Sequence, residues 1–261
     1  MWFIFALLTT LAWGSADLFY KKGSNRNDKF SHVKIVIMVG LIMGTHGLWY
    51  MFSNDIHFSP FQLIRYFPVS LCYILSMTIG YIGLRYIELS ISSPIQNSSG
   101  AITAILLFIF FKQDLGWLEI LAIIIISTGV FALALLEKKK ENKELSSKRV
   151  TIDPKYQIGF VAILFPILYC LIDGLGTFAD AIYLDEMTLI SENDALLAYE
   201  FTFFICSAIA FIYYTVIKKQ KFIFIKERNK GYAAIFETIG QFFYVFAMSG
   251  SAIISAPLIS A

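Results

Sequence analysis

The sequence predicts an all-α polytopic membrane protein, and three observations support this fold class. Hydrophobic residues make up 57% of the 261 residues and charged residues only 15%, and the mean hydropathy is +0.68. A soluble globular chain carries about 25% charged residues, so this chain has too few charges to cover a water-facing surface. The apolar residues also gather into runs of membrane-spanning length, separated by short polar links.

Eight of these runs are long enough to cross a bilayer as helices, which takes about 20 mostly apolar residues. They lie near residues 2–20, 32–52, 66–86, 91–111, 117–136, 157–182, 194–217 and 231–249. A ninth run opens near residue 251 and stops at Ala261, about half the required length. The first run follows Met1 without a basic segment or a cleavage site, so we expect it to stay in the protein. An amphipathic stretch at 58–67 is predicted to lie at the membrane interface before the third span.

Lysine and arginine are sorted by link, which predicts the orientation. The links after the first, third, fifth and seventh spans hold 19 of the 21 basic residues, and the remaining two are Arg65 and Lys112. The positive-inside rule therefore predicts cytoplasmic odd-numbered links and an external N-terminus, in a plasma (inner) membrane. The longest link, 137–155, reads as a charge-rich connector rather than a folded unit.

The chain also contains a weak internal repeat. "SADLFY" at 15–20 resembles "FADAIY" at 178–183, and this offset carries the first span onto the sixth. Three residue pairs share the same separation of 163 positions: Asp17 and Asp180, Pro94 and Pro257, and Tyr81 and Tyr244. Because five spans are an odd number, the second copy must enter the membrane from the opposite side, as in inverted-repeat transporters. The predicted organisation is a first five-helix repeat over 1–136, the connector 137–155, and an incomplete second repeat over 156–261.

The residues at 11–22, "LAWGSADLFYKK", and the long stretch at 83–133 resemble the drug/metabolite transporter superfamily, in particular its EamA-like members. The resemblance implies ten spans in two five-helix repeats, and hence a chain truncated in its ninth span. Two features depart from the family pattern. Asp114 stands where members usually carry a glutamate, and members generally have a cytoplasmic N-terminus, contrary to the distribution of charges here.

Three carboxylates lie near the midpoints of their predicted spans: Asp173, Glu200 and Glu237. An acidic residue at the centre of a membrane helix costs about 2.5–3.5 kcal/mol on insertion scales, so we expect all three to face the bundle interior. They are candidates for proton coupling or cation binding. The alternative is a satisfied polar contact between helices.

The candidate substrate-binding residues combine these carboxylates with amides and aromatic rings near the same spans. Glu237 and Gln241 are four residues apart and share a helix face. Amides such as Gln96 can orient a polar solute, but they also serve as ordinary interhelical hydrogen-bond partners. Trp13 fits either a cavity wall or an interfacial anchor. The full predicted binding set is Trp13, Tyr81, Gln96, Asn97, Asp173, Glu237, Gln241 and Tyr244.

A second predicted set is assigned to gating, because the repeat places its members at matched positions of the two halves: Asp17, Pro94, Asp180 and Pro257. A local helix-end pair with Lys21 would also explain Asp17. His46 follows a Gly-x-x-x-Gly pattern that indicates close helix packing, and we nominate no metal site.

These observations favour a secondary transporter that moves a small organic solute (a metabolite, an amino acid or a drug-like compound) by alternating access, with protons as a candidate coupling ion. The absence of ATP-binding, metalloprotease and nucleophile motifs argues against a pump or an enzyme, and we expect no cofactor and no nucleic-acid partner. The alternative is a non-transporting membrane scaffold or an inactive remnant. The sequence leaves open whether the protein is a monomer or a homodimer.

Overall fold

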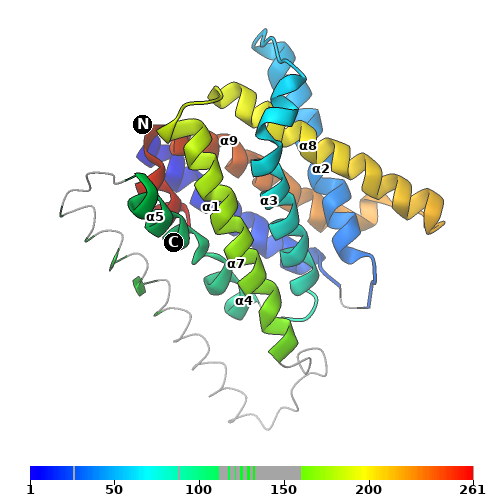
Figure 1. Cartoon of the computed structure of the whole chain (residues 1–261). Helices are drawn as coiled ribbons and strands as arrows, with labels where there is room; N and C mark the ends of the chain where they lie inside the picture. The colour runs from blue at the N-terminus through cyan, green and yellow to red at the C-terminus, as the bar shows by residue number, and fades with distance from the viewer. Residues whose placement is uncertain are drawn as a thin grey trace.

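The computed structural model describes residues 1–25, 27–87, 89–111 and 160–260, together with a few single positions between 117 and 132. These residues form helices joined by short links, with no strand among them (Figure 1). Seven of the described helices are long and apolar enough to cross a membrane. The predicted all-α membrane class is therefore confirmed.

The helices follow the predicted spans closely at the positions that the structure describes. They are α1 (Trp2–Gly23), α2 (Ser31–Ser53), α3 (Phe61–Gly83), α4 (Leu89–Gln96), α5 (Ser99–Phe111), α7 (Phe160–Ala181), α8 (Glu192–Ile212) and α9 (Arg228–Ile259). Short π-helical turns, η2 (Ile182–Glu186) and η3 (Tyr213–Ile217), extend α7 and α8, and the 3₁₀ turn η4 (Phe224–Glu227) precedes α9. Most of the predicted fifth span, the connector 137–155 and Asp114 lie outside the described residues.

One local prediction was wrong. The stretch 58–67 does not form a separate interfacial piece, because α3 begins at Phe61 and takes in all but its first three residues. Pro60 stands directly before the first helical residue. Its fixed backbone angle suits the start of a helix, so the chain enters the third span earlier than hydropathy alone indicates.

One predicted span is interrupted, and a kink separates the predicted eighth span from the ninth run. The run at 91–111 is divided into α4 and α5 by a turn at Asn97 and Ser98, and Pro94 lies one turn before that break. Helix α9 contains a non-helical residue, Ser251, with φ −176° and ψ 90°. The ninth run that hydropathy places near 251 is thus the part of α9 beyond this kink. Asp185 of η2 accepts a hydrogen bond of 2.8 Å from the backbone N–H of Ala252, at the start of that part.

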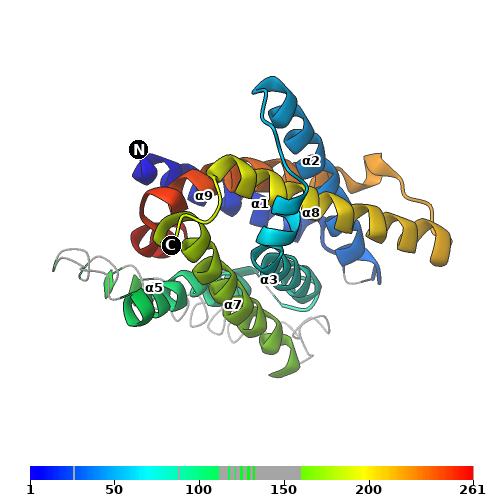
Figure 2. The same cartoon turned by 45° about the horizontal axis from the view of Figure 1, so that its top comes forward.

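The helices pack in three principal pairs, which join parts of the chain far apart in sequence. Helix α1 lies along α9, α3 lies along α7, and α8 crosses α2 (Figures 1 and 2). The α2–α8 crossing is close because glycines face the partner helix. A Cβ atom added at Gly40 would lie 2.1 Å from the carbonyl oxygen of Phe203. Small residues let membrane helices approach to backbone contact in this way.

At the end of the bundle that carries the basic links after α1 and α8, hereafter the basic end, charged side chains join the two halves of the chain. Lys34 of α2 donates to Asp28 at 2.8 Å and to Glu227 at 3.0 Å, and Lys230 also donates to Glu227. Burial alone would raise the pKa of Asp28. The hydrogen bonds from Lys34 and from the backbone N–H of Phe30 outweigh burial and hold that pKa below its usual value.

Lys34→Met is expected to lower the free energy of unfolding by about 2 kcal/mol at neutral pH, between the values for exposed and for fully buried ion pairs. Because the pKa of Asp28 is depressed, its contribution is present at neutral pH and is lost as pH falls through about 4 and below. The difference in the free energy of unfolding between wild type and variant should therefore become smaller at acidic pH. Thermal unfolding in detergent across this pH range measures it. Lys29→Met, at an exposed neighbouring position, is the control. An equal loss in both variants would contradict the prediction.

Candidate functional site

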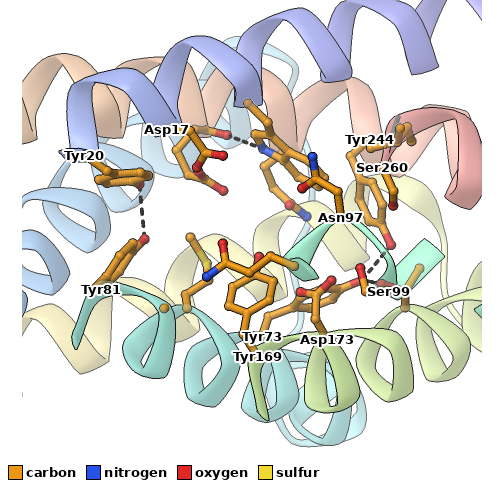
Figure 3. Close-up of a pocket in the computed structure, with 18 of the residues that line it drawn as sticks. Asp17, Tyr20, Tyr73, Tyr81, Asn97, Ser99, Tyr169, Asp173, Tyr244 and Ser260 are labelled. Carbon is orange, nitrogen blue, oxygen red and sulfur yellow. Dashed lines mark hydrogen bonds between the residues drawn. The ribbon is translucent and has the colours of Figure 1, made fainter. Parts of the chain in front are cut away.

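A cavity of about 100 Å³ lies in the centre of the bundle. Its walls come from α1, α3, α4, α5, α7, α8 and α9, so both halves of the chain contribute (Figure 3). The lining side chains that carry polar groups are Trp13, Asp17, Tyr20, Tyr73, Tyr81, Gln96, Asn97, Ser99, Tyr169, Asp173, Thr177, Tyr199, Glu237, Gln241, Tyr244 and Ser260.

All eight residues of the predicted binding set line this one cavity. They come from five helices and the turn after α4, and folding brings them together. Their role in binding a solute stays a prediction. The sequence reasoning missed four tyrosines that also line the cavity: Tyr20, Tyr73, Tyr169 and Tyr199. No sequence signal distinguished them, because the chain has 14 tyrosines spread over its apolar runs.

Three carboxylates line the cavity: Asp17, Asp173 and Glu237. Asp17 projects from α1 and Asp173 from α7, on facing walls (Figure 3). The Ser76 hydroxyl donates to Asp173 at 3.3 Å, and the Glu237 side chain is only 7% exposed. None of the described lining residues is a lysine, an arginine or a histidine. The cavity therefore gathers three carboxyl groups, and no described residue of its wall is basic.

Aromatic side chains make up much of the remaining wall, and two hydrogen-bonded tyrosine pairs lie at its ends (Figure 3). Tyr81 donates to Tyr20 at 3.1 Å, close to the ends of α3 and α1 at the basic end. On the other side, the hydroxyl groups of Tyr73 and Tyr244 are 2.6 Å apart. Trp13 packs against the Tyr244 ring with 5.1 Å between ring centroids. Each tyrosine pair joins one helix of the first half to another helix across the cavity.

Two amides complete the cavity. Gln96 and Gln241 are 9% and 1% exposed, and neither Nε2 atom has a hydrogen-bond partner. Buried amide donors without partners are uncommon, because each forfeits its hydrogen bonds to water. A solute with an oxygen acceptor would satisfy them. A second hollow, of about 170 Å³, adjoins the cavity and shares Asp17 and Asp173 with it while adding Thr10 and Ser93.

The residues assigned to gating occupy three kinds of position. Asp17 lies in the cavity wall itself. Asp180 is fully buried near the end of α7, where it accepts a hydrogen bond from Tyr66 at the start of α3. Pro94 and Pro257 are buried inside α4 and the last part of α9. Their movement during a transport cycle stays a prediction.

Glu200, the third mid-span carboxylate, lies outside the cavity. It is fully buried on α8, and its Oε1 atom is 2.8 Å from Nδ1 of His46 on α2. The sequence predicted that the carboxylate of Glu200 faces the bundle interior, but it did not predict the contact with His46. That pairing depends on the α2–α8 crossing, which no local pattern reveals.

The fold and the cavity define the class of protein: a polytopic helical membrane protein with an acidic and aromatic cavity in the centre of its helix bundle. The EamA-like transporter family matches residues 1–135, which is more than half of the chain. The protein belongs to this family of membrane transporters. No curated protein sequence matches the chain.

A crystal structure of another protein shares the fold. It has a TM-score of 0.53 at 10% sequence identity, and the match covers 95% of this chain and 86% of that one. At this identity the likeness shows the fold alone.

Proposed function

We propose that the protein is a secondary transporter that binds a small organic cation in the central cavity and exposes it alternately to the two sides of the membrane. The observation that carries the proposal is the charge of the cavity, which holds Asp17, Asp173 and Glu237 and no basic residue among those described. A buried carboxylate without an opposite charge nearby costs several kcal/mol. A cationic solute supplies the missing partner, whereas an anion would add to the repulsion.

The other lining groups narrow the chemistry of the solute. Aromatic faces attract ammonium groups, best when water is excluded, and tyrosines and Trp13 surround this cavity. The free amide donors of Gln96 and Gln241 suit a hydroxyl or carbonyl oxygen. Both hollows, about 100 and 170 Å³, are smaller than the roughly 300–1,000 Å³ of drug-binding pockets. The solute is therefore a small amine with an oxygen acceptor rather than a bulky drug.

The packing of the helices supports alternating access by two inverted halves, 1–136 and 156–261 joined by the connector. The offset of 163 positions relates α1 to α7 and α3 to the first part of α9. The α1–α9 pair thus corresponds to the α3–α7 pair, and α2 and α8 correspond to each other across the centre of the bundle. In inverted-repeat transporters the two halves rock about a site near the membrane midplane.

The two tyrosine pairs suit opposite gates. Tyr81 and Tyr244 are related by the same offset, and each bonds to a tyrosine on another helix. Opening the Tyr20–Tyr81 pair would connect the cavity to the basic end, and opening the Tyr73–Tyr244 pair would connect it to the opposite end. In the plasma membrane, with the basic end cytoplasmic, these gates would face the cell interior and exterior respectively.

A ligand panel on the purified protein tests this proposal. Choline carries a quaternary ammonium and a hydroxyl, glycine betaine carries the same ammonium with a carboxylate, and succinate is an anion. We expect choline to raise the melting temperature, betaine less, and succinate not at all. A ligand at 100 times its Kd stabilises by about 2.7 kcal/mol. Preferred binding of succinate would contradict the cation assignment. Folded protein that binds no member of a wider amine panel would favour the alternative, a non-transporting scaffold.

A further inference from the structure

The His46–Glu200 pair sits at the crossing of α2 and α8, away from the central cavity. Glu200 has no exposed surface, and its second oxygen, Oε2, has no hydrogen-bond partner. That oxygen lies against Gly47 of α2, where an added Cβ atom would approach it to 2.9 Å. A side chain at position 47 would therefore displace the carboxylate from its present place between the two helices.

His46 connects this buried carboxylate to the surface of the bundle. Its side chain is 24% exposed and lines a groove of about 510 Å³ between α2 and α9. The groove continues past Tyr50 to Asn54, the residue that follows the last turn of α2. At 1.5 Å per residue, His46 lies about 10 Å below that helix end. Because Nδ1 is engaged by Glu200, the second ring nitrogen, Nε2, is the atom that can take up a further proton.

The groups that face Glu200 are few. His46 and Tyr50 of α2 interact with it electrostatically. Helix α3 meets the preceding residue, Tyr199, through Tyr73 and Met77, and α9 meets His46 through the ring of Phe242. Among the described residues we find no amine and no second carboxylate from α3 or α9 at this position. Within the described part of the chain, His46 is therefore the basic side chain that meets Glu200.

We propose that His46 and Glu200 form a proton-binding site, separate from the solute cavity, that couples transport to the proton gradient. This inference rests on the proposed transport function. With neutral His46 donating from Nδ1, the pair carries one net negative charge, and a proton added at Nε2 makes it neutral overall. Since a net charge buried between α2 and α8 is costly, the closed crossing holds the proton. Its release requires these helices to separate or the groove to admit water.

A short path links this site to one of the tyrosine pairs. Tyr199 precedes Glu200 on α8 and lines the solute cavity. Its ring lies 5.6 Å from that of Tyr73, which bonds to Tyr244. A shift of α8 against α2 on proton release would therefore move Tyr199. This side chain packs against the Tyr73–Tyr244 pair, which is the gate opposite the basic end. Proton loss and gate movement would then occur together.

Proteoliposome assays with labelled choline test the assignment. Exchange without any gradient reports solute binding and gating, and accumulation driven by a pH gradient reports coupling. We expect both Glu200→Gln and His46→Gln to show exchange rates within about twofold of wild type. The accumulation driven by the pH gradient should fall at least about tenfold in each variant. Tyr50→Phe, which keeps both members of the pair, should behave as wild type. Melting temperatures of the purified variants check that they fold.

The outcomes separate this proposal from the transport function on which it rests. If wild-type protein exchanges neither choline nor another small amine, the transport function fails. If exchange is present and Glu200→Gln retains pH-driven accumulation, the coupling site is overturned and transport stands. Loss of exchange in both folded variants would also overturn a proton site separate from the solute path.

A second measurement needs no change to the pair. The chain has three histidines, so ¹⁵N-histidine labelling gives signals from three rings, with two nitrogens in each. His32→Asn and His57→Asn assign the other two. We expect the His46 ring to show a hydrogen-bonded Nδ1. A His46 ring whose Nδ1 makes no hydrogen bond would overturn the proposal.

Discussion

Glu237→Gln is expected to weaken binding of a small organic cation by about 10- to 100-fold, with a matching loss of transport at limiting solute. The substitution keeps the size of the side chain and removes one of three negative charges from the cavity. Hydrogen bonds to charged groups contribute about 1.5–3 kcal/mol, and each 1.4 kcal/mol is tenfold in affinity. Choline titration of purified protein and uptake in proteoliposomes measure the effect.

Asp55→Asn is the matched control for this prediction, because it removes a carboxylate from an exposed link outside the cavity. It should leave choline affinity unchanged. Equal loss in both variants would point to a general electrostatic effect on the membrane surface. Unchanged affinity in Glu237→Gln would contradict a direct contact between this carboxylate and the solute.

Gly40→Leu is expected to prevent folding or to lower the free energy of unfolding by about 3 kcal/mol, at the upper end of overpacking effects. The first added carbon would lie 2.1 Å from the backbone oxygen of Phe203 and 2.5 Å from Cβ of Ser207. A backbone atom cannot rotate away, so α2 and α8 must separate. Their separation also breaks the hydrogen bond of 2.7 Å from Ser207 to the carbonyl of Ile37.

Gly14→Leu provides the comparison, since an added Cβ at Gly14 meets nothing within 4 Å. Size-exclusion profiles and thermal unfolding in detergent should show wild-type behaviour for Gly14→Leu and aggregation or a lower melting temperature for Gly40→Leu. Similar behaviour of the two variants would mean that the α2–α8 crossing is looser than described.

The sequence was most informative where a residue type is costly in a membrane. Asp173 and Glu237 were assigned to the interior because a carboxylate cannot face lipid cheaply, and both line the cavity. Helical periodicity predicted that Glu237 and Gln241 share one face of their helix, and both side chains line the cavity. Hydropathy divided an eighth run at 231–249 from a ninth that opens near 251, and the kink at Ser251 falls at this division.

The sequence was least informative about pairings between helices. Tyr73 and Tyr199 belong to apolar runs in which a lipid-facing and a cavity-facing ring look the same. His46 and Glu200 are 154 positions apart and meet only through the α2–α8 crossing. Asp17 was assigned to gating from the repeat, yet it lines the cavity beside Glu237. A gating role and a binding role for Asp17 therefore need not exclude each other.

Counterflow of labelled choline in proteoliposomes tests the central claim, transport of a small cation through the cavity, most directly. Vesicles loaded with unlabelled choline should accumulate label transiently, faster with wild-type protein than with Glu237→Gln, and excess betaine should compete less well than excess choline. Folded wild-type protein that gives no counterflow with choline or any other small amine would contradict the account. So would counterflow of an anionic solute that choline does not inhibit.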